Sequence, residues 1–96
     1  MKYEWDEAKR QSNIQKHGLD FIDVDEVFSD PYGIEFEDDR YDYNETRLAF
    51  IGIYRSVVVT VIVYIDKEEC RRIISFRKAN KKERGYYEND KRKIYK

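Results

Sequence analysis

The chain has 96 residues, which is enough for one domain over residues 1–96 but not for several. Its 41% hydrophobic and 16% aromatic residues exclude a disordered chain. Its single cysteine excludes an intramolecular disulfide, and its longest apolar run is too short to span a bilayer. We therefore expect a cytoplasmic protein. The net charge is only −1, but residues 20–45 carry eleven acids and one base whereas residues 71–96 carry eleven bases and three acids, so the last part suits phosphate or an acidic partner.

The first predicted element is a helix over residues 7–17. Asp6 is suited to the N-cap, and Gly18 is suited to the left-handed residue that follows a helix. Lys9, Asn13 and His17 recur every four residues, with Lys16 beside them, so their side chains are expected on one face. His17 is the only histidine and a candidate for proton transfer. The alternative, favoured by spacing alone, is that its imidazolium only caps the helix.

The rest of the chain predicts one short helix, several strands and a last helix. Apolar residues at spacings of three and four indicate the short helix over Phe21–Phe28, and Asp30–Gly33 is typical of a turn. Strands are expected at residues 34–37, 46–54, 57–65 and 71–77. An acidic loop over residues 38–45 and a turn at residues 55–56 are expected between them, and a basic helix is expected from Asn80 through Tyr87. The β-branched run at 57–65 indicates a central strand, and the Asn80-x-x-Glu83 spacing indicates a capping box. This order predicts an α+β domain with a four-stranded antiparallel meander, two N-terminal helices and a C-terminal helix.

The last strand and the helix after it hold most of the candidate phosphate ligands. Simple alternation puts Ile73, Ser75 and Arg77 on one face of the strand and Arg72, Ile74 and Phe76 on the other. The basic side chains and the hydroxyl that form a possible anion site are Arg72, Ser75, Arg77, Lys78, Lys81, Lys82 and Arg84. Pairing of the strand arginines with Glu45 or Glu83 is an equally supported alternative.

Glu45 and Arg47 form a further candidate pair on one face of the strand at 46–54. They make either a salt bridge or an acid/base and charge-stabilising pair. One histidine and one cysteine cannot form a zinc site, and no cofactor fingerprint is present, so neither metal nor cofactor is expected. Cleavage of RNA needs neither, because the ribose 2′-hydroxyl is the nucleophile.

Several separated motifs resemble the BrnT family of type II toxins. They occur in order from Trp5 to about Glu88: Glu4-Trp5-Asp6-Glu7-Ala8-Lys9, Asn13, Lys16-His17-Gly18, Phe21, Val27-Phe28-Ser29-Asp30-Pro31, Glu45-Thr46-Arg47, Ile51-Gly52, Arg72-Ile73-Ile74-Ser75-Phe76-Arg77-Lys78-Ala79, Glu83-Arg84 and Tyr87. Phe76 departs from the small residue usual in the closing block, and the loop at 37–44 is more acidic than the family pattern.

The resemblance implies a RelE-like fold and an endoribonuclease that inhibits translation. It also implies a BrnA-like ribbon–helix–helix antitoxin, which forms a heterotetramer with the toxin, binds operator DNA and represses the operon. On this basis the candidate catalytic residues are Arg72 and Arg77 for charge stabilisation, His17 and Glu45 for proton transfer, and also Arg47 and Tyr87. The candidate RNA-binding residues are Lys9, Asn13, Lys16, Ser75, Lys78, Lys81 and Lys82. The mechanism further requires the late-strand arginines and the first helix to share one groove. A non-catalytic RNA-binding or protein-interaction module is the alternative.

Overall fold

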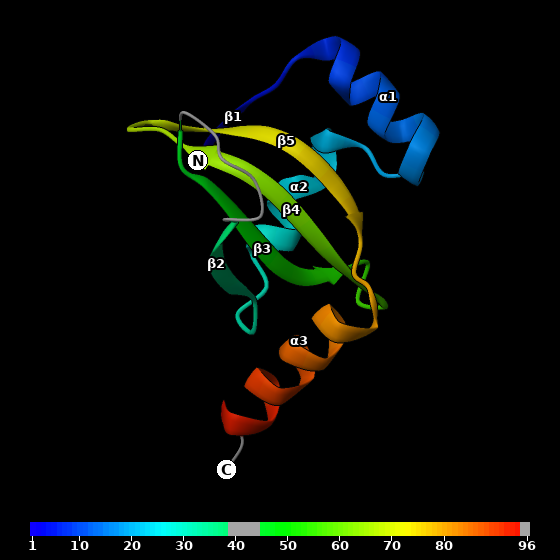
Figure 1. Cartoon of the computed structure of the whole chain (residues 1–96), viewed down its shortest axis with the longest axis vertical. Coiled ribbons are helices and arrows are strands. Elements are labelled where there is room, and N and C mark those ends of the chain that lie inside the picture. The colour runs from blue at the N-terminus through cyan, green and yellow to red at the C-terminus, as the bar shows by residue number, and fades with distance from the viewer. Residues whose placement is uncertain (39–44, 95–96) are drawn as a thin grey trace.

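The computed structural model describes residues 1–38 and 45–94, with side chains up to Asn89. The elements, in chain order, are β1 (Lys2–Glu4), α1 (Glu7–His17), η1 (Phe21–Asp23), α2 (Val24–Phe28), β2 (Ile34–Asp38), β3 (Arg47–Tyr54), β4 (Val58–Asp66), β5 (Cys70–Lys78) and α3 (Lys81–Ile94). In Figure 1, α1 lies beyond the β5 side of the sheet, and α3 leaves the end of β5 and extends away from the strands. The fold is therefore α+β, as predicted. The predicted acidic loop lies mostly at residues 39–44, outside the described residues.

The sheet has five strands in the order β1-β5-β4-β3-β2, which corrects the predicted four-stranded meander. Strands β2 to β5 are antiparallel neighbours, as expected, but β1 pairs with β5 in parallel, from Lys2 opposite Cys70 to Glu4 opposite Arg72. A three-residue strand of mostly polar residues carries no alternation signal, so its place in the sheet is decided only by the β5 edge.

The predicted end signals of the helices are present. The Asp6 carboxylate accepts hydrogen bonds from the backbone of Ala8 and Lys9, and Gly18 ends α1 at φ 69° with its amide bonded to the Ile14 carbonyl. Before α3, Asn80 and Glu83 exchange side-chain to backbone hydrogen bonds of 2.8 and 2.9 Å. Residues 21–28, predicted as one helix, form the 3-10 turn η1 and the short helix α2 instead.

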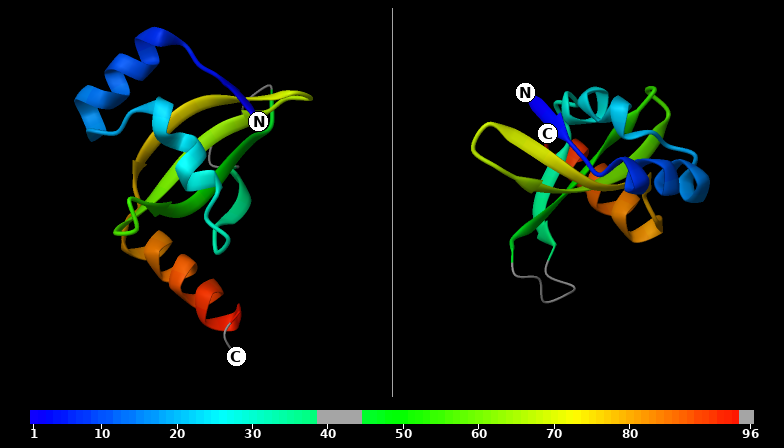
Figure 2. Two further views of the ribbon diagram at one scale, coloured as in Figure 1. Left: turned by 180° about the vertical axis from the view of Figure 1, so that it is seen from behind. Right: turned by 90° about the horizontal axis from the view of Figure 1, so that it is seen from above.

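Two apolar clusters lie on opposite faces of the sheet. The larger joins η1 and α2 to Ile62, Tyr64 and Phe76, and Figure 2 shows these helices lying across the strands when the molecule is viewed from behind. The smaller joins α3 to the other face through Tyr87, next to Ile51 and Val61. Strand β4 is buried from Thr60 to Tyr64, so the prediction of a central strand covered on both faces is confirmed.

A β-bulge in β5 corrects the predicted faces of that strand. Val63 is opposite Ser75, but the next residue of β4, Tyr64, is opposite Ile73, so Ile74 is an additional residue without its own partner. Directly opposite residues share a face, and Tyr64 alternates with Val63 and Ile65. Ile73 therefore packs in the same cluster as Phe76, and Arg72, opposite Ile65, lies on the same face as Ser75 and Arg77. Simple alternation was wrong here because the bulge shifts the period by one residue.

Candidate nucleic-acid interface

One pocket lies between α1 and the edge of β5, and we call it the α1 pocket. It has a volume of about 270 Å³ and is lined by Lys9, Ser12, Asn13, Lys16, His17, Ile74 and Ser75. The predicted face of helix 1 is therefore confirmed as a shared surface, and Ser75 from β5 joins it. Ser12 was not predicted, although its helical spacing from Lys9 and Lys16 places it on the same face. None of the described residues that line this pocket has a carboxylate.

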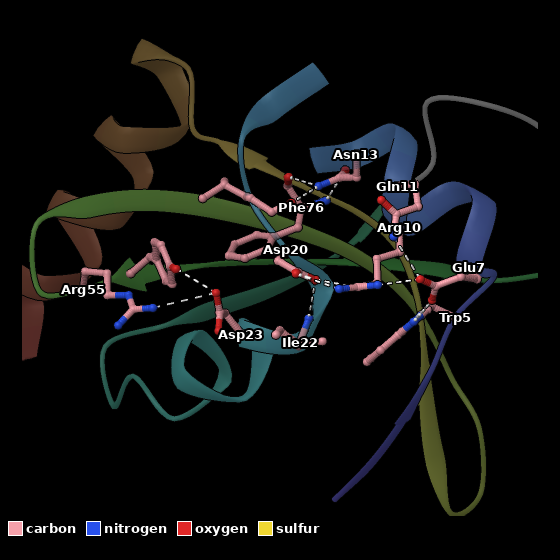
Figure 3. Close-up of polar contacts among 12 residues, drawn as sticks. Trp5, Glu7, Arg10, Gln11, Asn13, Asp20, Ile22, Asp23, Arg55 and Phe76 are labelled. Atoms are coloured by element: carbon pink, nitrogen blue, oxygen red, sulfur yellow. Dashed lines mark hydrogen bonds and ion pairs between the residues drawn. The ribbon is translucent and has the colours of Figure 1, made fainter. Parts of the chain in front are cut away.

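Asn13 differs from its neighbours because its amide is buried and fully engaged. Its Nδ2 donates to the carbonyls of Leu19 at 2.9 Å and Phe76 at 2.8 Å, and its Oδ1 accepts from the Phe76 amide at 3.1 Å. Figure 3 shows the side chain pointing from α1 to the backbone of Phe76. Asn13 thus pairs with β5 as a neighbouring strand would, and this geometry supports a structural role for an RNA-binding candidate.

A second network holds α1 to the turn that follows it. The Arg10 guanidinium donates to both carboxylate oxygens of Asp20, at 2.8 and 3.0 Å, and also to Glu7, and Figure 3 shows Arg10 between these two acids. These hydrogen bonds from Arg10 lower the pKa of the Asp20 carboxyl. The helix that borders the α1 pocket is therefore held to the rest of the fold through Arg10 and Asn13.

The second group of candidates lies on the face of the sheet opposite η1 and α2. Because of the bulge, Arg72, Ser75 and Arg77 are on this face of β5. On β3, Leu48 is opposite the core residue Tyr64 and so faces η1 and α2. Its neighbour Arg47, which is opposite Asp38, therefore points to the other face, with the β5 arginines. The structure thus places Arg47 of β3 on the same face as the two arginines of β5.

Each of these arginines has a carboxylate neighbour. Arg77 donates two hydrogen bonds to Glu83, at 2.8 and 2.9 Å, and both side chains are largely buried. Arg72 lies 3.6 Å from Glu4, and Arg47 lies 3.9 Å from Glu45. Internal pairing of the arginines, left open by the sequence, is thus present. The partner of Arg72 was missed because it belongs to the unpredicted strand β1.

A further pocket, which we call the sheet pocket, lies between this face and α3. It has a volume of about 290 Å³. The described lining residues from the sheet are Phe36, Glu37, Asp38, Ala49, Val61 and Arg77, and those from α3 and the cap before it are Asn80, Lys82, Glu83 and Tyr86. Arg77 lines the sheet pocket whereas Ser75 lines the α1 pocket, so the predicted single groove is replaced by two pockets on either side of the end of β5.

The two late tyrosines have different environments. Tyr87 is 2% exposed, and its hydroxyl donates to Asp30 at 2.7 Å. Burial, and then this hydrogen bond, raises the pKa of Tyr87, so its hydroxyl retains its proton. Tyr86 is 47% exposed and lines the sheet pocket. Tyr87 is thus a packing residue, whereas Tyr86 presents its ring to the pocket, a difference that no sequence signal indicated.

The remaining basic candidates are near the start of α3. Lys78, Lys81 and Lys82 are exposed, and only Lys82 lines the sheet pocket. Arg84 donates to the Ala79 carbonyl at 2.9 Å and so contributes to the start of the helix. Among the described residues, no cluster of His, Cys, Asp and Glu is placed to hold a metal ion. The helices of that same part of the chain include none with the length and apolar character to cross a membrane.

Comparison with known proteins agrees with the motifs and the fold. Residues 5–83 match the family of BrnT ribonuclease toxins of type II toxin–antitoxin systems. The crystal structure of the ribonuclease toxin BrnT of Brucella abortus is 33% identical in sequence, covers 84% of this chain and 99% of its own, and superimposes with a TM-score of 0.65. Curated protein sequences include no significant match. With most of its length matched in both sequence and fold, this chain belongs to the BrnT family of ribonuclease toxins.

Proposed function

We propose that this chain, as a single cytoplasmic domain, is a metal-independent endoribonuclease that cleaves RNA and thereby inhibits translation. The observation that carries the proposal is the α1 pocket, where Lys9, Lys16 and His17 meet Ser12 and Ser75 and none of the described lining residues has a carboxylate. A pocket of this composition attracts a phosphodiester and supplies both hydrogen-bond donors and a group that transfers protons.

The reaction we propose uses the nucleophile of the RNA itself. The 2′-oxygen forms a bond to the adjacent phosphorus as the bond from phosphorus to the 5′-oxygen of the next nucleotide breaks. The products are a 2′,3′-cyclic phosphate and a 5′-hydroxyl, so one proton leaves the 2′-hydroxyl and one reaches the departing oxygen. We assign proton transfer to His17, which can both accept and donate, and charge stabilisation to Lys9 and Lys16.

The arginines hold the flanking RNA in this proposal. Ser75 and Arg77 lie two residues apart on one face of β5, a separation of about 7 Å, so a chain bound at Ser75 passes close to Arg77. Arg72 and Arg47 lie on the same face, each beside a carboxylate, and offer further guanidinium donors to the flanking RNA. Glu45 remains a candidate for proton transfer only if it leaves Arg47, and we therefore assign that role to His17.

The test is cleavage of RNA in EDTA by purified, antitoxin-free protein. We expect products with 2′,3′-cyclic phosphate ends, and a loss of about 10²- to 10⁴-fold in rate for His17→Ala. Lys2→Ala, which changes an exposed cation on β1, is the matched control and should cleave at the wild-type rate. Folded protein that leaves RNA intact, or a His17→Ala variant that keeps full activity, contradicts the proposal.

The partner we propose is a BrnA-like ribbon–helix–helix antitoxin encoded beside the toxin. Two copies of each protein form a heterotetramer. This complex binds operator DNA through the antitoxin and represses the operon. In the same proposal, the toxin fold belongs with the RelE-like toxins. The family's assignment to type II systems supports an antitoxin partner. Expression of the toxin alone should arrest growth, and expression with the neighbouring gene should restore it.

A second candidate is a non-catalytic RNA-binding module of the same fold. The internal pairing of Arg77 with Glu83 favours it, because a paired guanidinium is less available to a phosphoryl group. This candidate predicts salt-dependent RNA binding without cleavage products. The cleavage assay above separates the two.

A further inference from the structure

We propose that the sheet pocket binds one unpaired nucleobase of the RNA, and that it prefers bases with an amino group. This inference rests on the proposed function, since it requires RNA as the ligand, but it concerns a different pocket from the one that carries the cleavage chemistry.

Two exposed aromatic rings meet at this pocket. Phe36 of β2 is 41% exposed and Tyr86 of α3 is 47% exposed, and both line the pocket together with Ala49 and Val61. The other large apolar side chains exposed in the described part of the chain are Met1, Ile22 and Val57, and none of them lines this pocket. Small apolar side chains with two aromatic rings form a surface on which a flat ring can stack, and stacking on aromatic side chains is the main way in which proteins hold unpaired bases.

The charges of the pocket favour a base over a phosphate. The described lining residues include three carboxylates, those of Glu37, Asp38 and Glu83, against two cations, Lys82 and Arg77, and Arg77 is already paired with Glu83. These carboxylates repel the negative charge of a phosphate, whereas a neutral base is not repelled. A carboxylate oxygen accepts more than one hydrogen bond. The amino groups of adenine and cytosine are hydrogen-bond donors, whereas the corresponding position of uracil is an acceptor. The pocket therefore favours adenine and cytosine over uracil.

The position of the pocket suits a nucleotide next to the one cleaved. The Lys82 ammonium lies 6.0 Å from the centre of the Tyr86 ring, so a base stacked on that ring has a cation near its own phosphate. Along β5, Arg77 in the sheet pocket and Ser75 in the α1 pocket share a face. A single RNA strand can therefore place a base in the sheet pocket while a neighbouring phosphodiester occupies the α1 pocket.

The experiment measures binding without cleavage. Short single-stranded oligonucleotides of adenosine, cytidine or uridine with 2′-O-methyl groups lack the nucleophile, and their affinity is followed by fluorescence anisotropy. For the wild type we expect tighter binding of the adenosine and cytidine strands than of the uridine strand. Phe36→Ala and Tyr86→Ala should each weaken binding of the adenosine strand about 5- to 100-fold. Phe36→Leu, which keeps apolar bulk without an aromatic ring, should also weaken it.

The controls keep this inference separate from the proposed function. Ile22→Ala removes an exposed apolar side chain outside the pocket and should leave affinity unchanged. If folded Phe36→Ala and Tyr86→Ala bind RNA with wild-type affinity, the base site is overturned. If His17→Ala at the same time impairs cleavage, the proposed nuclease function still stands. If these two variants lose affinity for the neighbour-encoded antitoxin and not for RNA, the pocket is a protein-docking surface and the inference is wrong. Equal affinity for the three strands overturns the base preference.

Discussion

Asn13 shows how one residue can combine a surface pattern with a core function. Its spacing from Lys9 and His17 places it on the pocket face of α1, but its amide bonds to the backbone of Leu19 and Phe76. These hydrogen bonds satisfy backbone groups on the part of the β5 edge that lies beyond the last β1 pair. The residue therefore closes the sheet edge rather than contacting RNA.

We predict that Asn13→Ala lowers the free energy of unfolding by about 2–4 kcal/mol, because it leaves buried backbone groups without partners. Denaturant unfolding measures the change. Gln15 is exposed on the same helix and lines neither pocket, so Gln15→Ala should stay within about 0.5 kcal/mol of the wild type. A variant as stable as the wild type that instead loses RNA affinity would assign Asn13 to the interface.

Asp20 provides a pH-dependent contribution to stability. Hydrogen bonds from Arg10 hold the pKa of its carboxyl below the value of about 3.9 expected in the unfolded chain. A lowered pKa stabilises the fold above the unfolded-state pKa, and this contribution is lost as the pH falls through the folded-state pKa. We predict that the free energy of unfolding decreases below about pH 4, and that Asp20→Asn makes this decrease less steep.

The measurement for Asp20 is denaturant unfolding at a series of pH values between about 2 and 6. Glu69→Gln, at an exposed carboxylate in the β4–β5 turn, changes the net charge equally without removing the Arg10 contact, and should preserve the slope. Identical slopes for Asp20→Asn and the wild type would show that this ion pair contributes nothing to acid stability.

At the scale of elements, two glycines differ in the space that a side chain would have. A Cβ built on Gly52 of β3 would lie 2.8 Å from Cγ1 of Val27 and 2.9 Å from its carbonyl oxygen, so α2 packs directly on the backbone of β3 at this point. A Cβ on Gly85 of α3 would meet nothing within 4 Å. The same substitution should thus have opposite effects in the two elements.

We predict that Gly52→Ala destabilises the fold by about 1–3 kcal/mol, because the backbone of α2 has to move away from β3. Gly85→Ala should stabilise it by about 0.5–1 kcal/mol, because alanine is the better residue in an open helix position. Thermal unfolding of the two variants checks both signs. A Gly52→Ala variant with wild-type stability would mean that α2 is not packed on β3 as described.

At the scale of the whole molecule, charge is unevenly distributed, since η1 and α2 carry several acids and the α1 pocket is lined by basic residues. The acids Asp23, Asp25 and Glu26 belong to η1 and α2, which cover one face, whereas Arg47, Arg72 and Arg77 lie on the other. An anionic strand is therefore attracted to the α1 pocket, where Lys9 and Lys16 lie among described lining residues that include no carboxylate. A small net charge thus conceals a local concentration of positive charge.

We predict that RNA affinity falls with salt, with a slope of log K against log salt of about −1.5 to −3, as expected for two to four phosphates bound as a single strand. Lys9→Ala and Lys16→Ala should each reduce the size of the slope by about 0.7, because each removes one phosphate contact. Lys2→Ala, on β1, should leave the slope unchanged. Anisotropy titrations at several salt concentrations measure these slopes, and equal slopes for all variants would remove the α1 pocket from the RNA path.

The sequence by itself determined the features that depend on neighbouring residues. The Asp6 cap, the Gly18 end, the Asn80–Glu83 box and the central β4 strand all follow from local hydrogen bonding or burial within a short stretch, and all are present. The family was also apparent from separated motifs in the correct order.

Only the tertiary structure decided which side chains meet. The bulge at Ile74 moved Arg72 to the face of Arg77, β1 added Glu4 beside Arg72, and Glu83 paired with Arg77 across the turn into α3. The first two outcomes depend on strand register and on a contact between distant segments, whereas the Arg77–Glu83 pair was one of the alternatives that the sequence left open. The alternation of residues along one strand contains no information about such contacts, because a shift of one residue reverses the face of every side chain beyond it.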